Sequence, residues 1–213
     1  MIRPFLLAMS LAGCGGILDL GSNSDETTTP DADDGHARRV FVTSTQYDGN
    51  LGGIAGADAK CASHATAAGL GGTYLAWLST SQTSPAQRMT QHPSGYALVD
   101  GTPIANDWAD LVDGSIAHDI NITETGAPYR GPGLTCRFVV GVWSGTTNNG
   151  TMSTFATTDP LYATCGDWTS SGYSGVIGGV YDSTGVADQL PYWSEQHCIP
   201  SCNSSGALYC VEQ

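Results

Sequence analysis

Short runs of β-branched and aromatic residues, separated by stretches rich in glycine, serine and asparagine, dominate the apolar pattern of this chain. Runs of this kind bounded by turn residues are typical of strands. Asp100-Gly101 is a turn signal that predicts a hairpin between residues 96–99 and 102–104. The other predicted strands lie at residues 40–44, 73–79, 138–143 and 207–211.

Helix signals interrupt these runs. Residues 55–68 are rich in alanine, and Gly69 follows them as a left-handed cap with Leu70 folding back. Ser84-Pro85 pairs a capping residue with a proline suited to the first helical position. Apolar residues at i, i+3 and i+4 within residues 106–113 predict a small amphipathic helix. The expected fold class is α+β, with two short helices, a small, mainly antiparallel sheet and long loops.

The polar pattern predicts three parts. Residues 1–13 carry one positive charge and then an apolar run that ends in small residues, as a signal peptide does. The run is too short for a membrane-spanning helix, which needs about 20 apolar residues. Residues 14–39 have too few large apolar side chains to form a core and are acidic up to residue 37, so they predict a flexible tether. Residues 40–213 are expected to form one folded domain.

Leu11-Ala12-Gly13-Cys14 resembles the lipobox of bacterial lipoproteins. In that family a peptidase cuts before the cysteine, which then becomes acylated, so the resemblance implies a lipid anchor at Cys14 and the membrane as a partner. Gly15 after the cysteine implies the outer membrane, with the domain facing the periplasm or the cell surface. The alternative is an ordinary signal peptide with an isolated cysteine. Lipidation is favoured because a free exposed thiol is reactive outside the cell.

Charge excludes several partners. Residues 40–213 contain 14 of the 20 acidic residues and four of the seven basic ones, which gives a net charge near −10. Nucleic acids and heparin-like polyanions both require stripes of lysine and arginine. We therefore expect neither as a partner.

Four motifs stand in chain order in residues 40–213. They are the Cys61–Ser79 helix and strand, Trp108-Ala-Asp-Leu111, Val142-Trp143-x-Gly145 with Cys165-x-x-Trp168, and the Ser201–Cys210 ending. Together they resemble the endostatin domain of collagens, which has a C-type-lectin-like fold. A bacterial lipoprotein family of unknown function is also similar, and its members end in a like Leu-Tyr-Cys-x-Glu-Gln. The resemblance covers nearly all of residues 40–213 and implies the C-type-lectin-like fold for them.

The resemblance also implies how the cysteines of the domain brace its loops. It pairs Cys61 with Cys210 and Cys165 with Cys202. Cys136 and Cys198 have no endostatin counterpart and would pair by elimination. A zinc site formed by His197, Cys198 and Cys202 is the alternative, but Cys-x-x-x-Cys in an exported domain is more often disulfide-bonded. We expect no metal site and no cofactor.

Candidate chemistry is sparse. The chain has no Gly-x-Ser-x-Gly, no His-Glu-x-x-His and no glycine loop for phosphate. His64 on the first helix is expected to be a partly buried packing residue rather than a catalytic base. Asp107, Asp110 and Asp113 share one helix face, where a solvated role is favoured over cation binding.

The tryptophans give the candidate binding surface. Trp193, beside Tyr192 and near Glu195, is the best candidate for an exposed platform on which a ligand stacks. These three residues form the possible ligand-binding surface. The other four tryptophans are expected in the core: Trp77, Trp108, Trp143 and Trp168.

The expected function is a lipid-anchored, non-enzymatic binding or adhesion module whose ligand is a glycan or a protein. One alternative is a calcium-dependent carbohydrate-binding domain, although the sugar-binding motifs of calcium-dependent lectins are missing. The other is a secreted hydrolase that uses loop carboxylates such as Asp167, Asp182 or Glu195.

Overall fold

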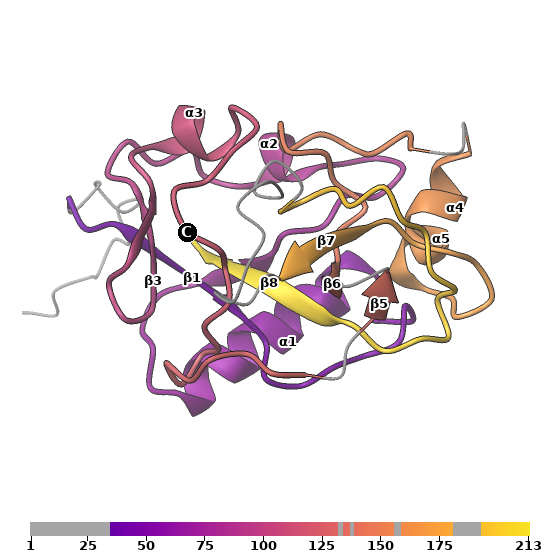
Figure 1. The fold of residues 1–213 in the computed structure, drawn as a ribbon, viewed down its shortest axis with the longest axis horizontal. Coiled ribbons are helices and arrows are strands. Elements are labelled where there is room, and N and C mark those ends of the chain that lie inside the picture. Colours follow the sequence, from indigo (N-terminus) through magenta and orange to yellow (C-terminus); the bar gives the residue numbers. More distant parts are fainter. Residues whose placement is uncertain (1–34, 132–133, 137–138, 156–158, 181–192) are drawn as a thin grey trace, which may run out of the picture. The chain divides into compact units, whose positions relative to one another are not determined.

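The computed structural model describes residues 35–131, 134–136, 139–155, 159–180 and 193–213 (Figure 1). In this part of the chain the fold is α+β, as predicted, with one mixed sheet and a few helices. The strands are β1 (Arg38–Val42), β2 (Tyr74–Ala76), β3 (Tyr96–Leu98), β4 (Pro103–Ala105), β5 (Leu134–Cys136), β6 (Val139–Trp143), β7 (Ile177–Val180) and β8 (Ala207–Glu212). The helices are α1 (Gly53–Ala67), α2 (Pro85–Arg88), α3 (Trp108–Leu111), α4 (Pro160–Ala163) and α5 (Cys165–Trp168).

The last strand, β8, lies at the centre of the sheet (Figure 1). It pairs antiparallel with β1 and β2 and parallel with β6, in the order β4-β3-β1-β8-β6-β5. β7 also pairs with β6, and only the β1–β3 and β6–β8 pairs are parallel among the described strands. The sheet is therefore mainly antiparallel, as predicted, but its eight strands make it larger than expected.

Alternate residues of β8 enter two different apolar clusters, as the period of two of a strand requires. Ala207, Tyr209 and Val211 lie in one cluster, which also contains Trp77 and Trp108. Leu208 and Cys210 lie in the other, with the buried face of α1. All residues of β8 are buried, so the sheet is covered on both faces at its centre.

Helix α1 ends as its sequence predicts. Gly69 has φ +71°, in the left-handed region. The N–H of Leu70 donates to the carbonyl of Ala65 at 2.9 Å, and that of Gly69 donates to Thr66 at 3.0 Å. These two bonds satisfy carbonyls that the helix end would leave open. Among the described residues there are five helices, whereas two short ones were predicted. Of these five, only α1 is longer than a single turn.

Residues Cys165–Trp168 form a left-handed turn that the sequence did not predict. Their φ angles are 53°, 63°, 57° and 64°, although only Gly166 is a glycine. The left-handed conformation costs roughly 1–2 kcal/mol for each residue that carries a Cβ. Surrounding contacts must therefore hold this turn in place.

The domain boundary differs slightly from the predicted one. β1 begins at Arg38, so two residues of the predicted tether, 14–39, belong to the sheet. The predicted signal peptide, Cys14 and most of the tether lie outside the described residues. Within the described residues, no helix has the length and apolar character needed to span a membrane.

Candidate functional site

Two disulfides with both partners among the described residues brace the domain. Cys61 of α1 is bonded to Cys210 of β8, with 5.5 Å between their Cα atoms, and Cys165 is bonded to Cys202 across 5.7 Å. These are the two pairings that the resemblance implied. Cys198 is also disulfide-bonded, and the side chain of its predicted partner, Cys136, lies outside the described part.

The zinc alternative is wrong, because the sulfur of Cys202 is used in a disulfide. His197, the third predicted ligand, stacks on Phe155 with 4.5 Å between ring centroids and 10° between ring planes. Among the described residues, no three histidines, cysteines or acidic residues gather where they could hold a metal ion.

The predicted stacking platform at Trp193 is also wrong. This side chain is 2% exposed and packs against Trp77 and Tyr209, with ring centroids 5.0 and 6.1 Å away. The reason is tertiary: the carbonyl of Trp193 accepts a hydrogen bond from Gly179 of β7, which draws this residue into the core. Glu195 is half-buried and accepts a hydrogen bond from the hydroxyl of Ser153, while Tyr192 lies outside the described residues.

The other four tryptophans are in the core, as predicted. Trp77, Trp143 and Trp168 are fully buried and Trp108 is 8% exposed. Two of them anchor loops through their indole N–H groups. Trp143 donates to the carbonyl of Tyr47 at 2.8 Å, and Trp168 donates to that of Ser79 at 2.7 Å.

The three aspartates at α3 that were weighed as cation ligands form hydrogen bonds with nearby residues instead. The Asp107 carboxylate caps α3 by accepting the N–H of Asp110 at 2.8 Å. Asp110 in turn accepts from Asn106, and Asp113 accepts from Ser115. The three carboxylates therefore stabilise turns around α3.

Of the proposed hydrolase carboxylates, Asp182 lies outside the described residues. Asp167 accepts the N–H and the hydroxyl of Ser81 and the hydroxyl of Thr164. Each of these bonds ties the left-handed turn to its surroundings.

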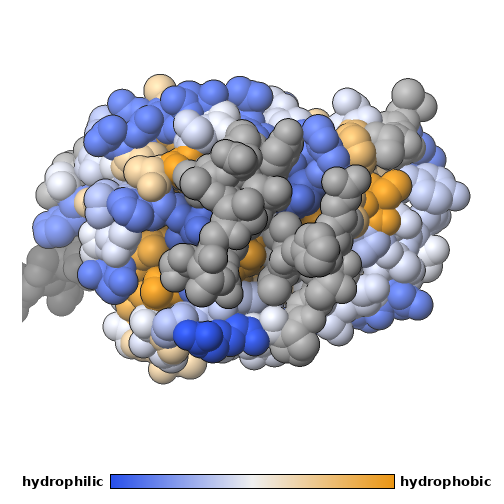
Figure 2. Space-filling model, in the orientation of Figure 1, coloured by the Kyte–Doolittle hydropathy of each residue, from blue (hydrophilic) through white to orange (hydrophobic). Residues whose placement is uncertain are grey.

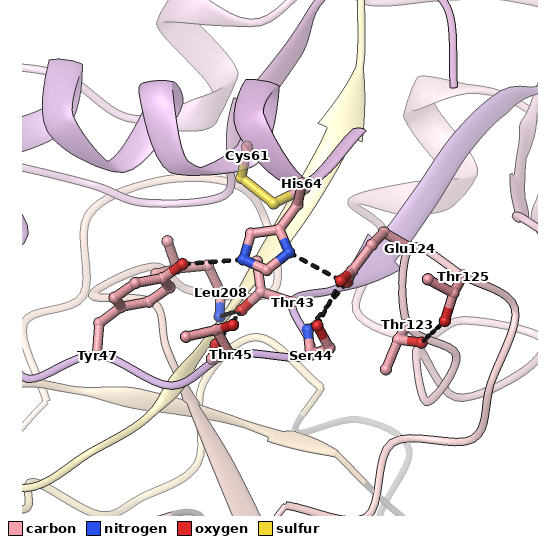
Figure 3. Close-up of polar contacts among 11 residues, drawn as sticks. Thr43, Ser44, Thr45, Tyr47, Cys61, His64, Thr123, Glu124, Thr125 and Leu208 are labelled. Carbon is pink, nitrogen blue, oxygen red and sulfur yellow. Dashed lines mark hydrogen bonds and ion pairs between the residues drawn. A yellow bond between two sulfur atoms is a disulfide. The ribbon is translucent and has the colours of Figure 1, made fainter. Parts of the chain in front are cut away.

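A polar network around His64 joins α1 to two loops (Figure 3). The Nδ1 atom of His64 lies 2.8 Å from a carboxylate oxygen of Glu124, and its Nε2 atom lies 2.9 Å from the hydroxyl of Tyr47. Ser44 donates both its N–H and its hydroxyl to the same carboxylate. Lys60 lies over the Tyr47 ring, 5.1 Å from its centroid.

The surroundings set the protonation of this network. Burial raises the pKa of Glu124, but hydrogen bonds from Ser44 and His64 outweigh burial, so the pKa lies below its ordinary value. Burial raises the pKa of Tyr47, and the nearby Glu124 charge raises it further. The carboxylate therefore stays ionised, and the phenol stays protonated at neutral pH.

A carboxylate, an imidazole and a hydroxyl in this order resemble the parts of a general-base relay. In such a relay the distal nitrogen faces a hydroxyl that it can deprotonate. Here that nitrogen faces Tyr47, whose raised pKa opposes deprotonation. The network is thus suited to fixing α1 in place. His64 is partly buried as predicted, but its polar partners come from segments 17 and 60 residues away, which no local motif signals.

The described residues define a class of domain: α+β, with a curled mixed sheet, few and mostly short helices and two disulfides. A scan against models of known protein families gives no match to this chain, and a search of curated proteins gives no significant match. The function is therefore inferred from the chemistry of the residues themselves.

Proposed function

We propose that this protein is a lipid-anchored, non-enzymatic binding or adhesion module of the bacterial outer membrane, facing the periplasm or the cell surface. In this proposal Cys14 carries the anchor, the acidic segment after it acts as a tether, and residues 40–213 form a C-type-lectin-like domain. The domain presents a surface to a glycan or protein ligand.

One observation carries the fold assignment. The first strand of the domain lies beside the last, and the Cys61–Cys210 disulfide ties the first helix to that last strand. The resemblance to the endostatin domain implies this bond. A domain closed in this way holds both of its ends in one sheet and leaves its long loops for recognition.

The hydrogen bonds of two carboxylates favour binding over hydrolysis. The Asp167 carboxylate accepts hydrogen bonds from the hydroxyls of Ser81 and Thr164, and the Glu195 carboxylate accepts one from the hydroxyl of Ser153. A general acid or base must instead reach a reacting proton on the substrate. Both carboxylates support the positions of loops.

Acylation tests the anchor. Cells expressing the full-length chain would be labelled with radioactive palmitate and separated into membrane and soluble fractions. The wild type and a Ser24→Ala control are expected to carry label and to sediment with membranes, while Cys14→Ser loses both properties. Equal membrane association of Cys14→Ser would overturn the anchor.

A glycan array with and without calcium tests the binding function against the calcium-dependent alternative. The proposed module binds in either condition, whereas a calcium-dependent carbohydrate-binding domain loses its ligand when the ion is chelated.

A further inference from the structure

The sheet depends on β8 (Ala207–Glu212), which is the last of the described strands in chain order. β8 pairs with β1, with β2 and with β6. Among the described strands, β2 has no other partner, and no other pair joins β1, β3 and β4 to β5, β6 and β7. Without β8 the sheet would therefore divide into three separate pieces (Figure 1).

The residues on either side of β8 are also bonded to the first half of the chain. The N–H of Tyr47 donates to the carbonyl of Gly206 at 2.8 Å, and the N–H of Gly206 donates to the carbonyl of Tyr47 at 2.9 Å. Beyond the strand, the N–H of Gln213 donates to the carbonyl of Thr73 at 2.9 Å. Residues 206–213 therefore hold early segments in place along their whole length.

β8 completes both apolar clusters of the domain. All of its residues are buried, and those from Ala207 to Val211 belong alternately to one cluster and to the other. On the face shown in Figure 2, the described surface is mostly hydrophilic or intermediate in hydropathy, as expected when the large apolar side chains lie inside. Without β8 both clusters would be open to water, and burial of apolar surface is the main favourable term in folding.

The pieces that remain without β8 are too small to be stable by themselves. Isolated strand pairs are marginal in water, and a small sheet needs a covered apolar face. α1 (Gly53–Ala67) has 15 residues, which is at the limit for an isolated helix, and it packs on β2 and β8. The early part of the domain therefore has no stable support before β8 is in place.

Two cross-links fix the position of β8. Cys61–Cys210 bonds the strand to α1, and Cys165–Cys202 bonds the stretch before it to the left-handed turn. The bonded cysteines are 149 and 37 residues apart, and closing such loops costs conformational entropy when the thiols are free. Bonds of this kind persist in oxidising compartments but not in a reducing cytoplasm.

We infer that β8 is a folding gate: the domain stays unfolded until residues 202–213 are released and their cysteines are oxidised. In a reducing compartment the chain remains extended enough to pass an export channel, and it folds where an oxidant is present. This inference rests on the exported location in the proposed function, and it depends on neither the lipid anchor nor the ligand.

The oxidant that the gate requires belongs to the class of thiol–disulfide oxidoreductases. The thiolate of Cys210 attacks the disulfide of the oxidoreductase and forms a mixed disulfide with it. The thiolate of Cys61 then attacks the sulfur of Cys210 and displaces the oxidoreductase thiolate. For each bond formed, the chain loses two electrons and two protons, and the oxidoreductase takes them up as it becomes a dithiol.

Ribosome arrest of the full-length chain tests the gate. A short linker after Gln213 keeps residues 202–213 inside the exit tunnel, and a long linker places them outside. Both chains receive an oxidoreductase in its disulfide form and then a protease of broad specificity. The short-linker chain is expected to be digested as an unfolded chain is, and the long-linker chain at least about tenfold more slowly. A resistant fragment from the short-linker chain would overturn the inference.

Two variants at one position separate strand pairing from mere release of the chain. The N–H of Leu208 donates to the hydroxyl of Thr43 at 3.0 Å, and its carbonyl accepts the N–H of Thr43 at 2.9 Å. Leu208→Pro removes this N–H from the central strand, so its long-linker chain should stay sensitive to the protease. Leu208→Met keeps the N–H and nearly the same volume, and should become resistant as the wild type does. Resistance of Leu208→Pro would contradict the gate.

Reduction is the second test. In excess thiol, the purified full-length chain in detergent is expected to lose its near-ultraviolet circular dichroism and to regain it on reoxidation. Cys14→Ser removes a thiol outside the folded domain and should behave as the wild type does. A reduced chain that keeps its native spectrum would overturn the requirement for oxidation. None of these readouts uses membrane attachment or ligand binding, so failure of the gate and failure of the proposed function are distinguishable.

Discussion

The carboxylate of Asp167 accepts both the backbone N–H and the hydroxyl of Ser81, each at 2.6 Å. Asp167 lies in the left-handed turn with φ +57°, and Ser81 follows β2 after a short loop. The two bonds join segments 86 residues apart. They offset part of the backbone strain that the turn carries.

We predict that Asp167→Ala destabilises the domain by about 2–3 kcal/mol, because it removes hydrogen bonds to a charged group and keeps a Cβ in the left-handed region. Asp167→Gly loses the same bonds but relieves the strain, so its loss is about 1 kcal/mol smaller. Urea denaturation at neutral pH measures both. Thr66→Ala, at an exposed position of α1, is the control, and equal losses for Ala and Gly at position 167 would contradict the role of strain.

The sequence predicted features that depend on neighbouring residues. The end of α1 at Gly69 and the strands around Asp100-Gly101 follow from local patterns, and the burial of four tryptophans follows from the motifs in which they stand. The turn at 165–168 opposes local preference, since three of its four residues carry a Cβ, and it exists through distant partners. Trp193 is buried through its pairing with β7, and no nearby residue signals that pairing.

The two described disulfides differ in the length of chain that they close. Cys61 and Cys210 are 149 residues apart, and Cys165 and Cys202 are 37 apart. In the chain-entropy model, losing the longer closure costs about 5 kcal/mol and losing the shorter about 4 kcal/mol. We therefore predict that Cys61→Ala/Cys210→Ala is less stable than Cys165→Ala/Cys202→Ala by about 1 kcal/mol. Urea midpoints of the two double variants test the order, and a reversed order would show that native contacts outweigh loop closure.

Acid should weaken the fold through Glu124. Its pKa is lowered in the folded state, so it contributes stability that is present above about pH 4.3, the ordinary value for an unfolded glutamate, and is lost as the pH falls through the folded pKa. Glu124→Gln removes this contribution. The difference in unfolding free energy between wild type and variant should be largest at about pH 6–7 and shrink by about pH 3.

The same titration has an internal control. Ser44 supplies two of the hydrogen bonds that lower the pKa of Glu124, one from its hydroxyl and one from its N–H. Ser44→Ala removes only the hydroxyl, so the acid loss should begin at a higher pH than in the wild type. A free-energy difference between wild type and Glu124→Gln that stays constant with pH would contradict the assignment.

Trp193 gives a prediction that separates a core residue from a binding platform. The side chain is 2% exposed and lies against Trp77, whose indole N–H donates to the hydroxyl of Ser194 at 2.7 Å. Trp193→Ala removes a buried ring and leaves a cavity, so it should destabilise the domain by about 3–5 kcal/mol and weaken the near-ultraviolet circular dichroism of the tryptophan cluster. Tyr162→Ala, at a site that is 51% exposed, should change stability by less than about 0.5 kcal/mol. Urea denaturation of the two variants side by side measures the contrast. Wild-type stability in Trp193→Ala would contradict the burial of this side chain in the core.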